Sequence, residues 1–400
     1  VESQSMGTSG SARPPDWNQY GGTVPAPFVL SMSDPNGWSE AKIWFTTDGS
    51  DPRGPTGELY TAPLTLSSSQ EIRARVTDGS RWSPASQGVF LVATVPASAS
   101  NLVVSEFDYH PAAPSPAEID AGFTSAGDFE FIELMNVDPT NSVDLEGVAF
   151  VDGISFTFDG MVPIGARFLP PGGRVVLVRN PDGFSLRHGA SGAVVAGEFG
   201  GALNNGGERV ELADDDGTTI HAFTYGDRHP WPVDADGNGY SMVLIVPASI
   251  PVPDHNDPAS WRSSVFHGGS PGDHDTILFA GDPAADDDHD GLNAYLEFAQ
   301  GTSDASSTSR TVPRVVVEPS EVNGTPAGLV FEFRRNLAAD EVRFTIQSCV
   351  DLLSWTDASG EFLHLSTINN GDGTALSRYR SATSFPTPGR FYRLAVSPRP

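Results

Sequence analysis

The sequence is poor in cysteine, lysine and long hydrophobic runs. Cys349 is the only cysteine among 400 residues, so no disulfide can form within the chain. Lys42 is the only lysine, and acidic residues dominate, with a formal net charge of −28. Because such a surface repels phosphates, we expect no nucleic acid and no anionic membrane as a partner. No apolar run reaches the roughly 20 residues that cross a bilayer, so we expect no membrane span.

Catalytic motifs are also missing. The sequence has neither the G-x-G-x-x-G loop nor the H-R-D catalytic loop of a kinase. Residues 268–272 match G-x-S-x-G, the pattern around a hydrolase nucleophile, but Pro271 lacks the backbone N–H that an oxyanion hole needs. Cys349 ends an alternating segment, which favours a packed thiol over a nucleophile. We therefore expect no catalytic residues and no hydrolase, kinase or redox turnover.

Turn-forming residues are abundant, with 42 glycines and 33 prolines. They separate short segments in which hydrophobic and polar residues alternate, as half-buried strands require. The length also exceeds that of one domain of ~100–200 residues. The sequence therefore predicts an all-β fold of several sandwich modules in tandem.

The first module is predicted at residues 24–97, after a polar segment at residues 1–23 that we interpret as a flexible linker. The chain begins Val-Glu-Ser, without initiator methionine or signal peptide, so we expect it to be part of a longer protein. Trp44–Arg53, followed by Tyr60–Pro63 and Ile72–Arg75, resembles the chitobiase/β-hexosaminidase C-terminal module. This resemblance implies an immunoglobulin-like fold without catalytic activity.

The second module is predicted at residues 101–250. Phe129–Asn136, Arg174–Val178 and Leu203–Leu212 contain alternating segments with glycine- and asparagine-rich turns. In order and spacing they resemble a lamin-tail domain, with a longer loop at residues 120–127. The resemblance implies a second immunoglobulin-like sandwich.

Residues 311–400 form a third block, predicted as a C-terminal β-sandwich module. Leu329–Arg334, Val342–Gln347 and Phe391–Val396 alternate and resemble C-terminal modules of large secreted bacterial proteins. The intervening residues 251–310 are polar and rich in glycine, proline and aspartate, which indicates a linker. We therefore expect residues 101–247 to fold independently of residues 311–398.

This linker contains one explicit metal-binding pattern. Residues 286–297 match D-x-[DN]-x-[DN]-G-x₅-E, the calcium loop, at every prescribed position. Gly291 stands where the loop must turn, and Ala294 at position nine leaves a vertex for water. We predict one calcium ion, bound by three carboxylates, one backbone carbonyl and a bidentate glutamate: Asp286, Asp288, Asp290, Leu292 and Glu297.

The surroundings of the loop differ from those of a calcium sensor. Gly281 and Pro283 stand where an entering helix would run, whereas helical spacing follows the loop as far as Gly301, a predicted C-cap. The loop resembles the lone loops of dockerin-like and type-3-repeat linkers in secreted bacterial proteins. That resemblance implies that calcium rigidifies a junction, within a short calcium-loop and helix linker.

Two other polar groups imitate metal sites. Asp234, Asp236 and Asn238 begin like a calcium loop, but Gly237 comes two residues early and Ile245 occupies the twelfth position. A turn explains them better. Four histidines stand in the predicted linker region, where no rigid scaffold for zinc is expected: His255, His267, His274 and His289.

Two further groups could carry catalysis or ligand binding. Glu130 and Glu133 are three residues apart on a predicted strand, which places them on opposite faces and excludes a paired general acid and base. We expect both to be surface carboxylates. Trp38 and Trp82 are candidates for stacking on sugars, although tryptophans in strand segments usually serve the core.

The sequence thus favours a non-catalytic accessory or scaffolding region of an extracellular or cell-surface bacterial protein. It would serve adhesion, spacing or substrate association, act as a monomer, and contact an extracellular polysaccharide or protein. Modules of the two resembled families often follow a spore-coat-H (CotH)-type kinase domain, so an alternative is the tail of a secreted kinase. A carbohydrate-binding module is the third alternative.

Overall fold

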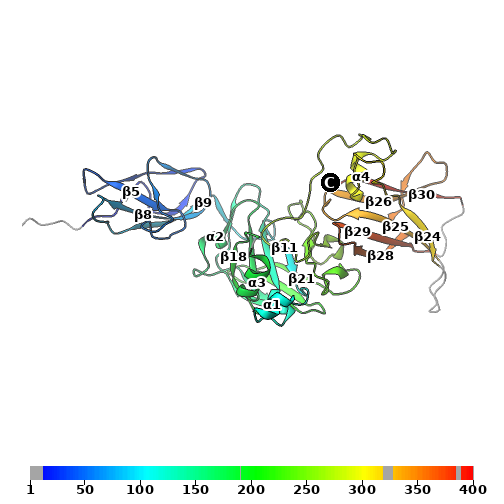
Figure 1. Ribbon diagram of the computed structural model, residues 1–400, viewed down its shortest axis with the longest axis horizontal. Helices are drawn as coiled ribbons and strands as arrows, with labels where there is room; N and C mark the ends of the chain where they lie inside the picture. Colours follow the sequence, from blue (N-terminus) through cyan, green and yellow to red (C-terminus); the bar gives the residue numbers. More distant parts are fainter. Residues whose placement is uncertain (1–11, 190, 319–327, 384–388, 400) are drawn as a thin grey trace, which may run out of the picture. The chain divides into compact units, whose positions relative to one another are not determined.

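The computed structural model describes residues 12–189, 191–318, 328–383 and 389–399, and the fold is all-β, as predicted (Figure 1). The chain divides into two compact units. The N-terminal unit contains residues up to 102 together with residues 136–148 and 158–173. The C-terminal unit contains residues 103–135, 149–157 and 174–400.

The N-terminal unit contains the first of the predicted modules. Alternation explains its central strand, in which Ile72, Ala74 and Val76 are buried and the intervening side chains are partly exposed. These three residues pack with Phe45 and Phe90 in one hydrophobic core. The main sheet has five strands, in the order β2 (Gly22–Val24), β9 (Ser86–Val92), β8 (Gln70–Thr77), β5 (Lys42–Thr46) and β6 (Glu58–Leu59).

This module begins earlier than predicted. Trp17 is buried, and residues from 16 onward form strands, so the flexible linker predicted at residues 1–23 is wrong for its last third; residues 1–11 lie outside the described residues. Two strand pairs complete the module: β1 (Asp16–Trp17) with β4 (Met32–Ser33), and β3 (Phe28–Leu30) with β7 (Leu64–Leu66). The unit also holds helix α2 (Ile164–Arg167) and a three-stranded sheet of β10 (Thr94–Pro96), β13 (Ser142–Asp144) and β16 (Phe168–Leu169).

The C-terminal unit contains two sheets of the lamin-tail region. The first has six strands, in the order β18 (Val195–Glu198), β17 (Arg174–Val178), β12 (Phe131–Asn136), β11 (Leu102–Asp108), β22 (Met242–Leu244) and β23 (Trp261–Ser263). The second has five, in the order β19 (Gly200–Gly201), β15 (Ile154–Thr157), β14 (Ala149–Asp152), β20 (Arg209–Ala213) and β21 (Thr219–Thr224). Short helices border them: α1 (Pro116–Asp120), η1 (Ala126–Phe129), α3 (Pro181–His188), η2 (Val233–Ala235) and η3 (Pro258–Ser260).

The third block is a two-layered β structure, as predicted. Phe331, Phe333, Ile346 and Phe362 pack between its sheets. The first sheet has the order β24 (Arg314–Glu318), β25 (Gly328–Asn336), β29 (Thr374–Ser381) and β28 (Phe362–Asn369). The second has the order β27 (Thr356–Asp357), β26 (Val342–Cys349) and β30 (Phe391–Pro398), with η4 (Ser359–Glu361) beside it. Cys349 ends β26 as a buried free thiol, as predicted.

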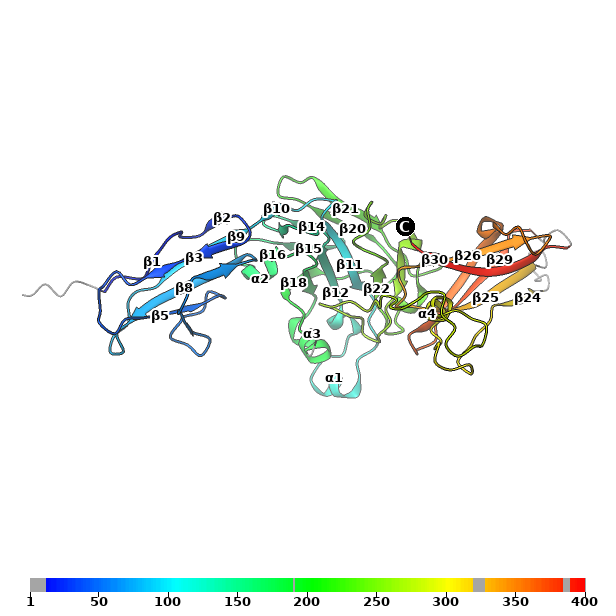
Figure 2. The same ribbon diagram turned by 90° about the horizontal axis from the view of Figure 1, so that it is seen from above.

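The segment predicted as a linker is instead packed at several places, although Ile277 and Leu278 are exposed. Its first strand, β23, is an edge strand of the six-stranded sheet. Further on, helix α4 (Ala294–Gln300) lies against β25 and β30 (Figure 2). Tyr295 and Ala299 of this helix share a hydrophobic cluster with Ala339 and Val342. The calcium loop and its helix therefore belong to the third block and not to a free linker.

A buried ion network joins the six-stranded sheet to the third block. Arg262 on β23 donates from Nε and Nη2 to the two carboxylate oxygens of Asp340 (2.6 and 2.8 Å). It also donates from Nη2 and Nη1 to those of Asp275 (2.6 and 3.1 Å). All three residues are at most 6 % exposed, so the network is closed to water. Because residues of both blocks share one buried charge network, we expect the two blocks to unfold together, in contrast to the independent folding predicted from the sequence.

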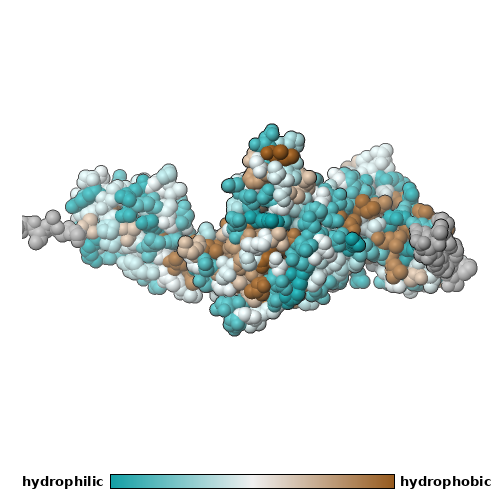
Figure 3. Space-filling view, turned by 90° about the horizontal axis from the view of Figure 1, so that it is seen from below, coloured by the Kyte–Doolittle hydropathy of each residue, from teal (hydrophilic) through white to brown (hydrophobic). Residues whose placement is uncertain are grey.

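The surface contains both hydrophilic and hydrophobic areas. The face shown in Figure 3 is largely hydrophilic, with separate hydrophobic patches. Among the described residues, no helix has the combination of length and hydropathy that a bilayer crossing requires.

Removal of Arg262 tests the network. Arg262→Met leaves two buried aspartates without their cation, so we expect the free energy of unfolding to fall by about 3–5 kcal/mol. Denaturant unfolding measures it. Arg209→Met is the control, because Arg209 pairs with Asp152 and Glu211 on the exposed surface, where loss of an ion pair should lower the free energy of unfolding far less. Equal losses in both variants would contradict the prediction.

Candidate metal centre

The predicted calcium loop is already folded around its acidic side chains. The amide of Asp290 donates to Asp286 Oδ1 and to Asp288 Oδ1 (both 3.1 Å), and the amide of Gly291 donates to Asp286 Oδ2 (3.2 Å). Gly291 has φ = 89°, the left-handed region that the predicted turn requires. Leu292 follows, and its amide donates to Asp290 Oδ1 (2.8 Å), which fixes the backbone at position seven.

Two overlapping groups of carboxylates converge at this loop. Oxygens of Asp286, Asp288 and Asp290 lie within 4.8 Å of one another. Oxygens of Asp288, Glu297 and Asp304 form a second such group. The structure thus brings together the four predicted side-chain ligands through their shared member Asp288.

Glu297 is the most informative of these residues. Its side chain is fully buried, yet neither carboxylate oxygen has a hydrogen-bond partner among the described residues. Burial, and then the negative charges of Asp288, Asp290 and Asp304, raise its pKa. A buried carboxylate without a donor is costly unless a cation neutralises it. Oxygens of Asp288 and Asp290 are likewise buried without a hydrogen-bond partner.

Helix α4 holds Glu297 in place. Asn293 caps the helix, since its side-chain oxygen accepts from the amide of Leu296 (2.9 Å). Gly301 ends it in the left-handed conformation, as predicted. The preceding Gly281 and Pro283 lie outside any helix, also as predicted. Because the helix packs on the third block, its glutamate is directed at the loop by a rigid support.

Asp304 was not among the predicted ligands. It lies beyond the twelve-residue loop, and its Oδ1 accepts from the amide of Asp287 (3.0 Å), which ties the following turn back to the loop. The sequence predicted water at the vertex that Ala294 leaves open, and the pattern alone did not identify Asp304. Arg310 lies nearby, with Nε 3.7 Å from Asp290 Oδ2. Its single positive charge does not balance the five carboxylates.

The four histidines do not form a site. His255 is buried against His221 and Trp261, whereas His274 is exposed and its Nδ1 lies 3.2 Å from the carbonyl of Thr276. Among the described residues, none of them belongs to a group of metal-ligating atoms. The packing of His255 also shows that this region is not the unstructured linker that the sequence indicated.

The second aspartate-rich loop serves structural contacts. Asp236 Oδ1 lies 2.6 Å from Nδ1 of His110. Asp234 Oδ2 accepts from the amide of Asn369 on β28 (2.8 Å), and Asn238 donates to the carbonyl of Val233 (3.3 Å). These contacts agree with the interpretation of a turn rather than a metal loop.

The expectation that Glu130 and Glu133 are surface carboxylates is wrong. Both are buried, at 3 and 0 % exposure, because each has a cation and other donors beside it. Glu130 accepts from Arg179 Nη1 (2.7 Å) and from the amide of Leu203 (2.8 Å). Glu133 pairs with Arg174 and accepts from Ser105 Oγ (2.5 Å). Each carboxylate therefore has its own structural partners, and no acid–base pair is formed.

The G-x-S-x-G segment has a structural role of the same kind. Ser270 donates from its amide and its hydroxyl to the buried Glu106 (2.8 and 2.9 Å), which also accepts from Ser241 Oγ (2.5 Å). The amide of Gly272 donates to Glu133 (2.7 Å). Gly269 leaves room for this contact, since a Cβ there would lie 2.3 Å from Glu106 Oε1. The segment thus donates hydrogen bonds to two buried glutamates. This structural role is consistent with the expectation that Ser270 is not a nucleophile.

The two candidate sugar-stacking tryptophans differ in exposure. The guanidinium of Arg81 lies 4.4 Å from the centre of the Trp38 ring, so one face of that ring is covered. Trp82 is 38 % exposed.

Comparison with known protein families supports two of the modules. Residues 19–87 match the family model of the chitobiase/β-hexosaminidase C-terminal domain, and residues 95–227 match that of the Lamin Tail Domain. Both are immunoglobulin-like accessory modules rather than catalytic domains. A comparison with curated proteins gave no match.

The buried glutamates predict a pH dependence. Burial, and then the charge of Glu133, raise the pKa of Glu106 to about 8, so the folded chain keeps a proton that the unfolded chain releases above its ordinary pKa of 4.5. The contribution of Glu106 to stability is therefore greatest below pH 4.5 and declines as the pH rises toward 8. We expect Glu106→Gln to flatten this decline in urea-unfolding free energies measured from pH 4.5 to 8.

Glu198→Gln is the matched control, because Glu198 is exposed on β18 of the same sheet. It should leave the pH profile unchanged. A Glu106→Gln profile as steep as that of the unmodified protein would show that another group causes the dependence.

Proposed function

We propose that this chain is a non-catalytic accessory region of an extracellular protein, in which one calcium ion stabilises the third block. Calcium would be held by the carboxylates of Asp286, Asp288, Asp290 and Glu297 and by the carbonyl of Leu292, with Asp304 as a further ligand. The buried, unpartnered carboxylate of Glu297 carries the proposal. Oxygen-only ligands and a flexible number of them suit calcium better than transition metals.

The segments on either side of the calcium loop are both held by the third block, and this indicates what calcium would do. The segment before the loop is bound to the third block, since the amide of Ile277 donates to the carbonyl of Ala338 (2.8 Å) and that of Phe279 to Glu341 Oε1 (2.7 Å). Helix α4 follows the loop on the same block. An ion between loop and helix would neutralise like charges that otherwise repel, and would thereby keep this segment folded.

An extracellular compartment would supply the calcium that such a site needs. Loops of this kind in extracellular modules bind calcium at roughly 10⁻⁴–10⁻³ M, a range that is filled only where calcium is abundant. An extracellular or cell-surface location, with adhesion, spacing or substrate association as the role, is consistent with the two accessory families matched. An upstream kinase domain in the parent protein is compatible with the same role.

Calcium titration tests the site. At about 100 times the dissociation constant, calcium should add about 2.7 kcal/mol to the free energy of unfolding. Isothermal titration calorimetry should show one site. Asp288→Asn and Asp304→Asn should weaken binding, whereas Asp287→Asn, a change at an exposed neighbour, should leave it unchanged.

Glu297→Gln separates loss of binding from loss of folding. Without calcium this variant should be at least as stable as the unmodified protein, because a buried unpaired charge has been removed. With calcium it should show no further stabilisation. Full calcium stabilisation in Glu297→Gln would refute the proposed site.

A further inference from the structure

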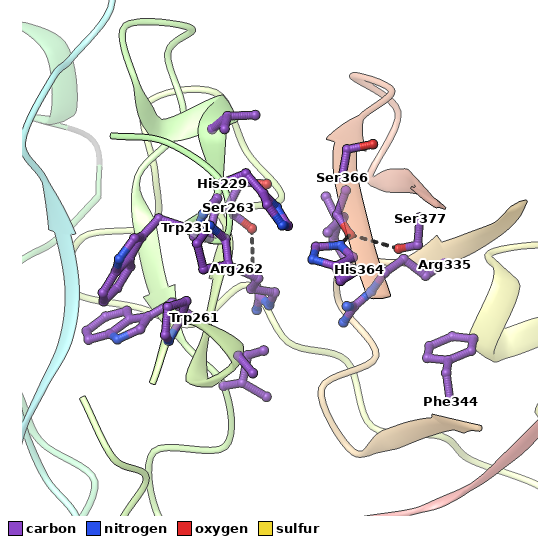
Figure 4. A pocket seen from close by; sticks show the side chains of 18 of the residues that line it. His229, Trp231, Trp261, Arg262, Ser263, Arg335, Phe344, His364, Ser366 and Ser377 are labelled. Atoms are coloured by element: carbon purple, nitrogen blue, oxygen red, sulfur yellow. Dashed lines mark hydrogen bonds between the residues drawn. The ribbon is translucent and has the colours of Figure 1, made fainter. Parts of the chain in front are cut away.

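A cavity of about 590 Å³ lies between the lamin-tail region and the third block, within the C-terminal unit (Figure 4). This volume falls within the ~300–1,000 Å³ typical of small-molecule sites. One wall comes from the loop around His229 and Trp231 together with β23. The other comes from β25, β26, β28 and β29, and its polar members include Arg335, His364 and Ser366.

Arg335 is the unusual residue of this cavity. It follows Phe331 and Phe333 at intervals of two along β25, so it continues the row of side chains that faces the core. Its Nε and Nη2 atoms are buried without a hydrogen-bond partner among the described residues. Figure 4 shows its guanidinium directed from the β25 wall toward the opposite wall. A buried guanidinium with free donors is a site for an anion.

The cavity has an excess of positive charge in a strongly acidic protein. Arg343 and Arg399 also line it. Arg262 adds no positive charge, because its two partners Asp275 and Asp340 leave one negative charge beside the cavity, which the other three arginines still outweigh. Asp257 is the one carboxylate among the lining residues, and its Oδ1 accepts from the amide of Ala259 (2.9 Å). The whole chain carries a formal charge of −28, so the positive charge of the cavity is opposite in sign to that of the protein as a whole. An anionic ligand should therefore bind in the cavity rather than elsewhere on the surface.

Hydroxyl and imidazole groups line the wall beside Arg335. The hydroxyl of Ser366 is buried without a partner among the described residues. Nε2 of His364 lies 2.9 Å from Thr367 Oγ1, which in turn lies 2.9 Å from Ser377 Oγ. Burial lowers the pKa of His364, which favours the neutral imidazole, able to donate or accept. These groups suit a ligand with several hydroxyls.

Aromatic rings supply the remaining surface. Trp231 lies on one wall, and Phe344 and Tyr379 lie on the other. Sugar rings present C–H groups that pack on such faces, while their hydroxyls bind polar groups at the edge. The combination of cation, hydroxyls and aromatic rings differs from a site for an inorganic anion, which needs no apolar wall.

We propose that this cavity binds a carboxylate-bearing sugar, as in a uronic acid unit of an acidic polysaccharide. Arg335 pairs with the carboxylate, Ser366 and His364 contact ring hydroxyls, and the aromatic side chains pack on the ring. The inference deepens the proposed accessory role, on which it rests, by giving the chemical class of a polysaccharide partner.

Binding of tri-galacturonate to the full chain tests it, by isothermal titration calorimetry at fixed calcium concentration. Arg335→Gln should weaken binding about 10- to 100-fold, the loss of a charge-assisted hydrogen bond. Arg334→Gln is the control, because Arg334 is adjacent, lies on the other face of β25 and pairs with Asp372 (3.0 Å). Thermal unfolding should show Arg335→Gln folded, since it loses a buried charge that has no partner.

Two comparison ligands separate the possible outcomes. A neutral trisaccharide of the same size should bind much more weakly, and so should benzoate, which has the carboxylate and ring but no hydroxyls. No saturable binding of tri-galacturonate, or equal binding by Arg335→Gln, would overturn the proposal. Benzoate binding as tightly as the sugar acid would overturn the sugar class. None of these outcomes bears on the calcium site, which Glu297→Gln tests separately.

Discussion

The buried guanidinium of Arg262 is the interaction on which the arrangement of the C-terminal unit depends. One side chain on an edge strand of the lamin-tail region satisfies two buried aspartates, Asp275 and Asp340. An unpaired buried charge is costly, so separating these three residues is unfavourable. The network therefore fixes the positions of the three segments that carry them relative to one another. The contact between Asp234 and Asn369 adds a second link. The cavity containing Arg335 lies beside Arg262 and depends on the same junction.

The repeated alternation of hydrophobic side chains made most of the fold predictable. Strands such as β8 and β25 show the period of two that half-buried sheets impose, and the turn residues between them were equally clear. Strand β11 is different, because its residues are all buried, including Glu106 and Asp108. Carboxylates within a strand normally indicate a solvent-facing side, so local pattern could not reveal that these are enclosed.

The candidate metal centre was predictable to the extent that its ligands are contiguous. The pattern at residues 286–297 gave the positions of Asp286, Asp288, Asp290 and Glu297, and the structure brings their side chains together. Asp304 was not predicted, because the turn after α4 brings it to the other carboxylates and the spacing of the calcium-loop pattern does not include it. Polar composition likewise suggested a free linker at residues 251–310. Its polar residues are instead buried against partners far away in sequence, as Ser270 is against Glu106.

The buried ion network implies that the lamin-tail region and the third block unfold together. Hydrogen exchange, followed by mass spectrometry at increasing urea concentrations, measures this most directly. We expect the slowly exchanging amides of β11 and β12 to have the same opening free energy as those of β25 and β26 as the urea concentration rises. The opening free energies of both groups should also depend on urea with the same slope. Convergence on two well-separated opening energies, with the third block exchanging while the six-stranded sheet stays protected, would contradict the claim.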